Sequence, residues 1–289
     1  MFDGFIQKRI NTSGAEINCR VGGNGPPLLL LHGYPQTHAM WHKIAGRLAK
    51  RYTVVMTDLR GYGDSSKPMS DQNHMPYSKR QMALDQIEVM EQLGFREFYL
   101  AGHDRGARVA HRLTLDHADR VKKLAVLDIA PTLAMYRKTD DAFARAYYHW
   151  FFLIQPAPYP ERMIGGDPEF YLRTKCGLLG GGVNAFSDQA MVEYLRCFND
   201  PDTIHATCED YRAAATIDLE HDEADLQNKI ECPVLVLWGA NGVIERCFDA
   251  LSEWRERASD VHGHSLPGGH YLAEELPDQT ATDFEAFFG

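Results

Sequence analysis

Five short, largely apolar runs alternate with helical patterns along this chain of 289 residues. They are 28-LLLLHG-33, 52-YTVVMTD-58, 98-FYLAGHD-104, 124-LAVLDI-129 and 233-PVLVLWG-239. Runs that are apolar almost throughout, instead of at every second residue, are typical of strands buried on both faces. Their alternation with helices predicts an α/β fold, with a mostly parallel, doubly wound sheet that carries helices on both faces.

One of the connecting helices should span residues 78–94. Ser78 has the side chain of an N-cap, and Gly94 suits the position that follows the end of a helix. The apolar run that starts at Phe98 follows directly. The sequence therefore predicts a helix that ends just before a buried strand.

A change of pattern after 128-DIAP-131 indicates an insertion. The chain becomes rich in aromatic residues and biased toward helices, as in 146-AYYHWFFLIQPAPYP-160. We predict a helical cap domain of residues 132–217, inserted into an α/β core domain of residues 1–131 and 218–289.

The charge balance argues against nucleic acid as a partner. With 30 Lys and Arg against 40 Asp and Glu, the formal net charge is −10, the wrong sign for binding phosphate backbones. The start, MFDGFIQKRINTSG, lacks the basic and apolar segments of a secretory signal, and no apolar run is long enough to span a bilayer. We therefore expect a cytoplasmic protein without a membrane partner.

Cysteine and histidine spacing gives no support for disulfides or a metal site. The six cysteines include no C-x-x-C pair, which favours reduced thiols. His38 and His42 have a spacing that metal ligands on a helix can have, but no further ligand lies nearby in the sequence. We expect neither a metal nor a cofactor.

The turn after the third apolar run carries an informative motif. The residues 102-GHDRG-106 resemble the nucleophile elbow G-x-Nuc-x-G, a strained turn that exposes one side chain above a parallel sheet. That side chain is usually serine, but here it is Asp104. A carboxylate can displace a leaving group from saturated carbon and form an alkyl ester. Asp104 therefore predicts chemistry unlike that of ordinary esterases and peptidases.

The order of motifs resembles the α/β-hydrolase superfamily over nearly the whole chain. The segments 32-HGYP-35, 58-DLRGYGDSS-66, the elbow, 128-DIAP-131 and 267-PGGH-270 follow one another as in that family. This resemblance implies the α/β-hydrolase fold and a catalytic order of nucleophile, acid and histidine.

The resemblance places the catalytic histidine at His270 and leaves a choice for the acid. The acid often follows the strand before the histidine, but that strand ends in 238-WGANGVIE-245, with Asn241 where an aspartate is expected. We therefore assign the acid to Asp128, at the end of the preceding strand, although Asp128 could instead only cap a loop. The other candidates are Asp218, Asp222 and Glu245.

Two arginines follow the nucleophile on one predicted helix. Related haloalkane dehalogenases and epoxide hydrolases usually have an aromatic residue directly after the aspartate, whereas this chain has Arg105. Arg108 lies three residues further on, so both can address one face of the site. We predict that they hold a substrate carboxylate between them. Pairing with internal acids such as Asp128 is the alternative.

The cap resembles that of fluoroacetate (haloacetate) dehalogenases. His149, Trp150 and Tyr211 are similar to the His-Trp pair and the tyrosine that hold the halide in that family. Imidazole, indole and phenol groups offer three hydrogen-bond donors to a small, strongly hydrated anion such as fluoride. Core packing is the alternative role for Trp150.

These resemblances imply a dehalogenase that converts a 2-haloacid, such as fluoroacetate or chloroacetate, to glycolate and halide through an aspartyl ester. The backbone N–H groups of Tyr34 and Arg105 form the expected oxyanion hole. The expected partner is this small anionic substrate, and the family resemblance suggests a homodimer.

Two other functions remain open. An epoxide hydrolase uses the same nucleophile, and Tyr147, Tyr148 and Tyr211 could protonate an epoxide oxygen, although Arg105 argues against a neutral substrate. A non-catalytic binding protein of this fold often lacks a member of the triad, whereas this chain has a candidate for each.

Overall fold

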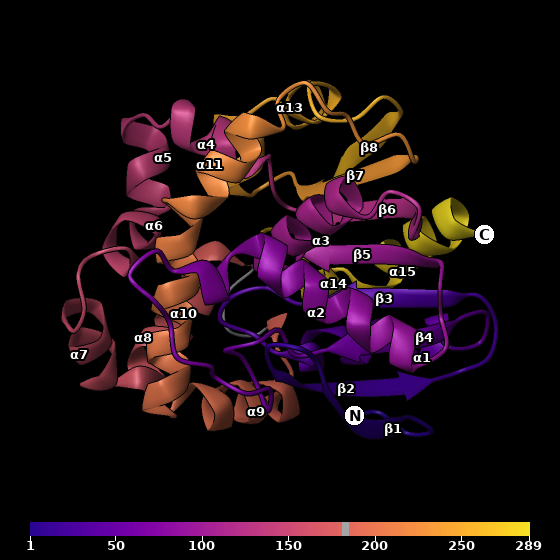
Figure 1. The fold of residues 1–289 in the computed structure, drawn as a ribbon, viewed down its shortest axis with the longest axis horizontal. Helices are drawn as coiled ribbons and strands as arrows, with labels where there is room; N and C mark the ends of the chain where they lie inside the picture. The colour runs from indigo at the N-terminus through magenta and orange to yellow at the C-terminus, as the bar shows by residue number, and fades with distance from the viewer. Residues whose placement is uncertain (181–184) are drawn as a thin grey trace.

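The computed structural model describes residues 1–180 and 185–289. Within them, one eight-stranded sheet has the strand order β1-β2-β4-β3-β5-β6-β7-β8 (Figure 1). The strands are β1 (Ile6–Asn11), β2 (Glu16–Gly22), β3 (Pro27–Leu31), β4 (Thr53–Thr57), β5 (Phe98–His103), β6 (Val121–Leu127), β7 (Val234–Gly239) and β8 (Val261–Leu266). The five predicted strands correspond to β3 to β7.

Neighbouring strands from β4 through β8 run parallel, while β2 pairs antiparallel with both β1 and β4. The predicted fold class is confirmed. The side chains of Leu28–Leu31 in β3 are fully buried, as continuous apolar strands require. We did not predict β1, β2 and β8. β1 and β8 are the edge strands of the sheet and contain several exposed polar residues, so an apolar run does not mark them.

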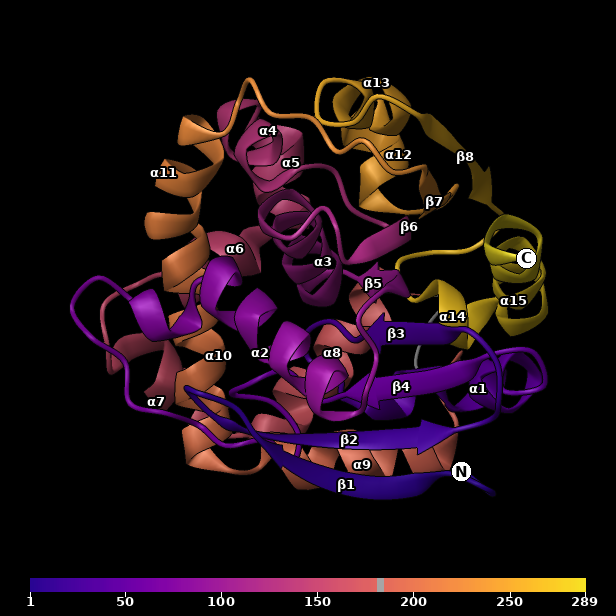
Figure 2. The ribbon, with the colours of Figure 1, turned by 45° about the vertical axis from the view of Figure 1, so that its right-hand side comes forward.

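Helices cover both faces of the sheet. α2 and α3 pack against each other on one face, and α1 and α15 pack against each other on the other face (Figure 2). The helices before and after the insertion are η1 (His38–Trp41), α1 (His42–Leu48), η2 (Met75–Tyr77), α2 (Lys79–Gln92), α3 (Arg105–Asp116), α12 (Val243–Cys247), α13 (Ala250–Arg255), α14 (Leu272–Glu275) and α15 (Pro277–Phe288).

The predicted helix of residues 78–94 is α2, and both of its predicted end signals are confirmed. The Ser78 side chain accepts a hydrogen bond from the backbone N–H of Gln81 at 3.2 Å, as an N-cap does. Gly94 follows the helix with a φ of +87°, a conformation that glycine adopts without steric cost.

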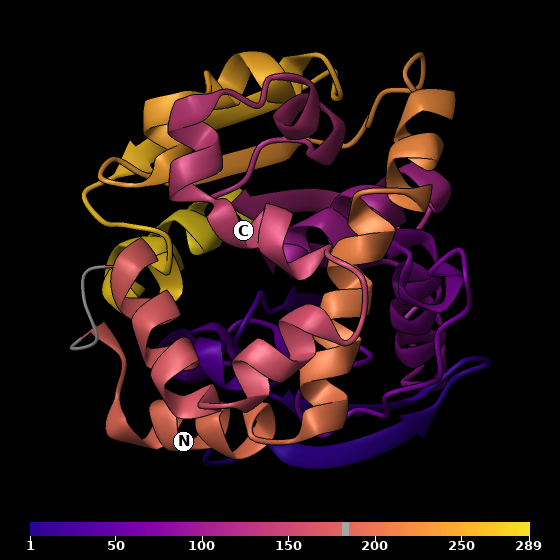
Figure 3. The same ribbon diagram turned by 90° about the vertical axis from the view of Figure 1, so that its left-hand side faces the viewer.

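The chain between β6 and β7 forms a helical layer beyond the carboxyl ends of the parallel strands (Figures 1 and 3). Its helices are α4 (Thr132–Arg137), α5 (Asp141–Ala146), α6 (Tyr148–Leu153), α7 (Tyr159–Gly165), α8 (Pro168–Leu179), α9 (Asp188–Phe198), α10 (Pro201–Ala214) and α11 (Ile217–Ala224). Helical structure thus continues past residue 217, and the domain boundaries at 131/132 and 217/218 stay a prediction. No helix in the described part of the chain is both long and apolar enough to cross a membrane.

A stretch as rich in glycine as 177-GLLGGGVN-184 is typical of a loop. Residues 177–179 instead form the last residues of α8, which ends at Leu179. Residues 181–184 of this stretch lie outside the described residues.

The strand order has a topological switch point at β3, whose two neighbours are β4 and β5. The chain leaves β3 for β4 on one side and later returns to pair β5 on the other side of β3. Loops that diverge in this way leave a space at the carboxyl ends of the two strands, where α/β proteins bind ligands. The loop after β3 carries Tyr34, and the turn after β5 carries Asp104.

Candidate active site

Asp104 sits in a strained turn between β5 and α3. Its φ of +45° and ψ of −115° are unusual for a residue with a side chain. The flanking glycines make the turn possible, because a Cβ at Gly102 would lie 2.6 Å from Ala107 Cα and one at Gly106 would lie 2.4 Å from the His32 carbonyl oxygen. The predicted elbow is therefore present, with Asp104 only 3% exposed to solvent.

One oxygen of Asp104 is held by the loop after β3. The backbone N–H of Tyr34 donates to Oδ2 of Asp104 at 3.0 Å. Gly33 allows this approach, since a Cβ there would come within 2.6 Å of Asp104 Cβ. Arg105 begins α3, so its backbone N–H has no acceptor within the helix. The two predicted oxyanion-hole residues thus flank the carboxylate.

Asp128 and His270 form a buried pair. Nδ1 of His270 lies 2.6 Å from Oδ2 of Asp128, and the backbone N–H of Gly239 donates to Oδ1 at 2.9 Å. Asp128 directly follows β6, and Gly239 ends β7, the neighbouring strand. Register in the sheet therefore orients the acid, which in turn orients the histidine.

The other acids that the sequence left open bind elsewhere. Asp218 accepts from the backbone N–H of Lys79 at 2.8 Å, and Asp222 pairs with Arg112 at 2.8 Å. Glu245 accepts from the indole N–H of Trp238. The structure brings only Asp128, of these four candidates, into contact with His270.

His103 is a neighbour of the triad that we did not single out. Its Nε2 lies 2.9 Å from the carbonyl oxygen of His270, so this nitrogen carries a proton and donates. Its ring centroid is 4.5 Å from that of His270. Burial, and then the nearby His270, lower the pKa of His103 to about 3, which keeps it neutral. The sequence signal that could have indicated His103 is its position directly before Asp104 in the elbow motif.

Charges around Asp104 keep it ionised. Burial by itself would raise the pKa of this carboxyl. Electrostatic interactions with His270, Arg108 and Arg105 outweigh burial and lower the pKa of Asp104 below its ordinary value. Asp104 is therefore available as a carboxylate at neutral pH.

Arg105 is largely committed to an internal acid. Its Nε donates to Oδ2 of Asp210 at 2.9 Å, and its Nη2 donates to Oδ1 at 2.8 Å. Tyr62 and Lys79 also bind the Asp210 carboxylate. The sequence allowed two roles for Arg105, which were substrate binding and pairing with an internal acid such as Asp128. The structure pairs Arg105 with an internal acid, and this acid is Asp210 of the cap instead of Asp128. Nη1 of Arg105 has no hydrogen-bond partner within the described residues.

Arg108 has a different environment. Nη1 donates to the Ala130 carbonyl at 3.2 Å and to the Thr132 hydroxyl at 3.0 Å, and Nη2 lies 3.3 Å from Met135 Sδ. Residues 1–180 and 185–289 provide no carboxylate partner for this guanidinium and no acceptor for its Nε. Burial lowers the pKa of Arg108, and the charge of Asp104 acts in the opposite direction. Arg108 is thus a buried cation suited to an anionic ligand.

The three predicted halide-binding residues are all buried and border this site. The Arg108 guanidinium lies 4.6 Å from the ring centroid of Trp150, and that of Arg105 lies 4.1 Å from the ring centroid of Tyr211. His149 and Tyr211 are edge to face at 5.8 Å. The indole Nε1 of Trp150 and the phenol Oη of Tyr211 lack hydrogen-bond partners in the described part of the chain. These donors are what a small anion would bind.

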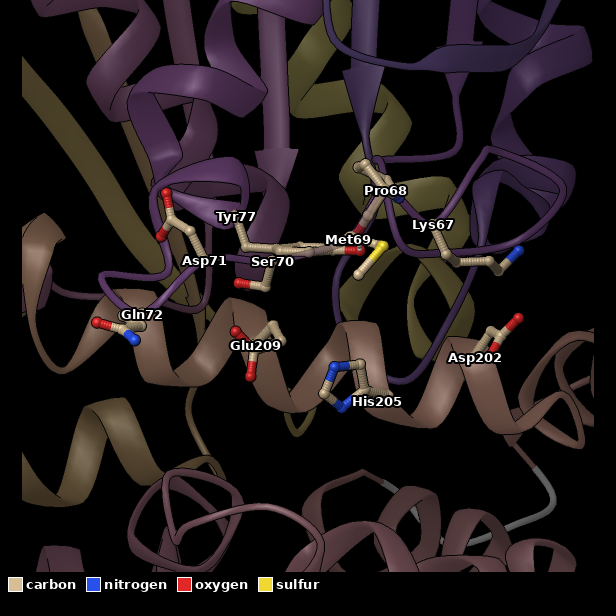
Figure 4. A pocket seen from close by; sticks show the side chains of 10 residues that line it. All are labelled: Lys67, Pro68, Met69, Ser70, Asp71, Gln72, Tyr77, Asp202, His205 and Glu209. Carbon is tan, nitrogen blue, oxygen red and sulfur yellow. Dashed lines mark hydrogen bonds between the residues drawn. The ribbon is translucent and has the colours of Figure 1, made fainter.

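A surface pocket of about 610 Å³ lies apart from this cluster (Figure 4). It separates the loop that follows β4 from α10, with Ser70 and Met69 on the loop opposite Glu209 and His205 on the helix. None of the three triad residues lines it. It is lined by Lys67, Pro68, Met69, Ser70, Asp71, Gln72, Tyr77, Asp202, His205 and Glu209.

The described residues contain no cluster of three or more His, Cys, Asp or Glu side chains placed to hold a metal ion. Of the two histidines with helical spacing, His38 binds Asp58 through Nδ1 at 2.8 Å, and His42 binds the Ala39 carbonyl at 2.9 Å.

Comparison with known proteins assigns the chain to a family. Residues 26–277 match the family model described as alpha/beta hydrolase fold. Fluoroacetate dehalogenase from Burkholderia sp. is 48% identical over 288 residues, which cover 99% of this chain and 95% of that protein. Soluble epoxide hydrolase from Corynebacterium sp. (strain C12) is 33% identical over 272 residues, which cover 92% and 91%.

A solved structure shows the same relationship. A crystal structure from Nostoc sp. PCC 7120, described as an alpha/beta hydrolase, superposes with a TM-score of 0.99 at 63% identity and covers 100% of this chain and 99% of its own. The order of motifs and the mostly parallel sheet agree with the family description. The resemblance predicted from the sequence is confirmed, and the chain belongs to the α/β-hydrolase family.

Proposed function

We propose that the protein is a haloacetate dehalogenase that hydrolyses fluoroacetate or chloroacetate to glycolate and halide. The observation that carries this proposal is an ionised Asp104 beside a buried guanidinium, Arg108, to which the described residues give no carboxylate partner. A carboxylate attacks saturated carbon, and a buried cation favours an anionic substrate. The 48% identity to fluoroacetate dehalogenase from Burkholderia sp. supports the same function.

In the first half-reaction, Asp104 displaces the halide. Oδ2 already accepts the N–H of Tyr34, so Oδ1 is the oxygen that attacks the carbon bearing the halogen. An O–C bond forms as the C–X bond breaks, and the electron pair leaves with the halide. His149, Trp150 and Tyr211 donate to the departing anion. Attack from the side opposite the halogen inverts the configuration of a substituted carbon.

In the second half-reaction, water hydrolyses the ester at the carboxyl carbon of Asp104. His270 takes a proton from the water, and Asp128 orients its ring and stabilises its positive charge. The developing oxyanion is Oδ2, which stays at the N–H of Tyr34. The leaving alkoxide takes the proton from His270 and becomes glycolate, so that one water is consumed and one proton and one halide are released.

Arg108 is the main ligand for the substrate carboxylate in this proposal. Its Nε has no partner within residues 1–180 and 185–289, and Nη1 of Arg105 is the other N–H group left over. Asp210 fixes the plane of the Arg105 guanidinium, so Arg105 contributes one donor and a fixed charge. The substrate carboxylate would therefore meet two unequal arginines instead of a symmetric clamp.

Halide release and diol formation separate this function from its main alternative. We expect fluoride and chloride release from fluoroacetate and chloroacetate, and no diol from styrene oxide. Diol formation without halide release would identify an epoxide hydrolase, the activity that the name of the Corynebacterium relative gives. Tyr147 and Tyr211 are buried, and the Tyr147 ring lies 6.4 Å from that of His270, whereas Tyr148 is 42% exposed. Two of the three tyrosines are thus placed as an epoxide hydrolase would need them, and the product measurement decides between the two functions.

We also propose a cytoplasmic homodimer with a cap at residues 132–217 inserted into the core at residues 1–131 and 218–289. The six cysteines are free thiols in the structure, which suits a reducing compartment. Light scattering at several protein concentrations tests the dimer. Expression of residues 132–217 alone tests the domain boundaries, because an independent cap should give a cooperative unfolding transition.

A further inference from the structure

The cap contains a buried lysine that has no carboxylate partner in the described part of the chain. Lys175 on α8 is 1% exposed. Its Nζ lies 2.5 Å from Nδ1 of His149, 5.5 Å from the ring centroid of Tyr148 and 6.0 Å from that of Tyr147. A buried ammonium group normally has an acid beside it.

Lys79 shows what a buried lysine looks like when its role is structural. Its Nζ contacts the carboxylates of Asp210 and Asp218, and its own backbone N–H also binds Asp218. Both lysines are nearly inaccessible to solvent. Lys79 is neutralised by two acids, whereas Lys175 donates to an uncharged ring nitrogen. A contribution to stability therefore does not explain why position 175 is a lysine.

We propose that Lys175 is a positioning residue, which fixes His149 in the tautomer that carries its proton on Nε2 and thereby makes His149 a donor to the leaving halide. The inference rests on the proposed dehalogenase function. A protonated Lys175 has donors and no acceptor, so in this state the ring nitrogen that faces it cannot carry a proton. The single proton of a neutral imidazole must then lie on Nε2.

The surroundings of His149 make the choice of tautomer matter. Burial, followed by the charge of Lys175, lowers the pKa of His149 well below its ordinary value, so the ring is neutral and has one N–H. The His149 ring lies 5.8 Å from that of Tyr211 and 6.4 Å from that of Tyr34, which places the imidazole among the groups of the active site. Without Lys175, the proton could move to Nδ1, and Nε2 would present a lone pair to the halide.

The charge of Lys175 adds to this effect. Burial lowers the pKa of Lys175 to about 7, and the negative charge of Asp104 acts against that decrease. When Asp104 becomes an ester, its negative charge passes to the halide. The same positive charge therefore serves the carboxylate before the reaction and the halide after it.

The experiment replaces Lys175 with methionine, which keeps the apolar stem and removes the donor. Lys175→Met should lower kcat for fluoroacetate by about 10- to 100-fold, the usual effect of removing a group that orients a ligand-binding histidine. Chloroacetate should lose less, and KM for both should change little. In a His149→Asn background, Lys175→Met should have little further effect, because there is no tautomer left to fix.

Nitrogen-15 NMR of the imidazole groups gives a readout that does not depend on turnover. The wild type should show His149 with a protonated Nε2 and an unprotonated Nδ1, assigned by its loss in His149→Asn. Lys175→Met should shift protonation toward Nδ1. Its melting temperature should stay the same or rise, because a buried charge without an acid is replaced by an apolar group.

Arg173→Met is the matched control. Arg173 lies on the same helix, with its side chain 42% exposed and paired with Glu169, so its loss removes a cation from α8 without touching His149. We expect it to leave kcat, KM and the His149 signals unchanged. If Lys175→Met does not fold, Lys175→Leu, which also lacks a hydrogen-bond donor, takes its place in both measurements.

Equal losses for the two substrates together with an unchanged His149 tautomer would overturn the positioning role. A fall in melting temperature that accounts for all of the lost activity would also overturn it, in favour of a structural role. If the wild type releases no halide from either acid, the dehalogenase function fails, while the NMR measurement still decides whether Lys175 sets the tautomer of His149.

Discussion

The carboxylates of the core and the indole and phenol donors of the cap differ in how far they are already paired. In the core, Asp104 is held by the N–H of Tyr34, and Asp128 is held by the N–H of Gly239 and by His270. In the cap, the donors of Trp150 and Tyr211 have no partner among the described residues.

This difference follows from the chemistry that each half is proposed to perform. The core must place a nucleophile and a base in one geometry, which backbone groups at the ends of neighbouring strands do well. The cap must stabilise a charge that appears only as the C–X bond breaks, so its donors have to be present but unused beforehand. We expect substitutions in the core to stop individual steps and substitutions in the cap to alter selectivity between halides.

The largest effect should come from Asp104→Asn. An amide is not a nucleophile at saturated carbon, so halide release should fall by roughly 10⁴ or more. Initial rates of fluoride and chloride release on freshly prepared protein measure it, because slow deamidation would regenerate the aspartate. Near-normal initial rates would show that the core half does not contain the nucleophile.

His270→Ala should separate the two half-reactions. Asp104 can still displace the halide, but no base activates water, so one equivalent of halide should be released and the ester should accumulate. Peptide mass analysis after incubation with chloroacetate should find the added group on Asp104. Full turnover with unmodified Asp104 would contradict the assignment of halide displacement to Asp104 and of ester hydrolysis to His270.

Trp150→Phe tests whether the cap selects the leaving group. The aromatic packing and the ring beneath Arg108 remain, but the indole donor is lost. Fluoride concentrates charge on a small atom, so kcat for fluoroacetate should fall by about 10²-fold, on the order of 3 kcal/mol, while chloroacetate is much less affected. If both substrates change by the same small factor, Trp150 is a packing residue and the contrast between the halves disappears.

Arg108→Leu tests the group that links the two halves. Loss of a buried charge-assisted contact should lower kcat/KM for chloroacetate by more than about tenfold. Wild-type enzyme should likewise be poor with chloroacetamide, whose C–Cl bond is similar but whose charge is absent. Equal turnover of chloroacetate and chloroacetamide would remove Arg108 from substrate binding and favour a neutral substrate.

The smallest effect should come from Tyr148→Phe. Tyr148 is next to His149 in the sequence, but its side chain is 42% exposed, and it supplies no donor to the site in our proposal. Halide release from both acids should therefore equal that of the wild type. A large loss would indicate that Tyr148 acts as a proton donor, as it would in an epoxide hydrolase mechanism.

Residue type and order were enough to identify the parts of the core that depend on local rules. Continuous apolar runs marked β3 to β7, and Ser78 and Gly94 marked the ends of α2, because strand burial and helix capping are properties of short segments. The elbow glycines and Asp104 could be recognised because only glycine tolerates such close backbone contacts on both sides of the turn. Resemblance to a family then suggested the remaining site residues.

Tertiary structure decided which charged groups meet. Asp210, 105 residues after Arg105, binds it from the cap, and Lys175 binds His149 from a different helix. No local pattern marks such pairs, because they depend on how α8 and α10 lie against α3 and α6. The sequence alone predicts an aspartate at the elbow with two arginines nearby. Folding decided that Arg105 has an internal acid and that Arg108 does not, because a buried charge is defined by the groups that surround it in space.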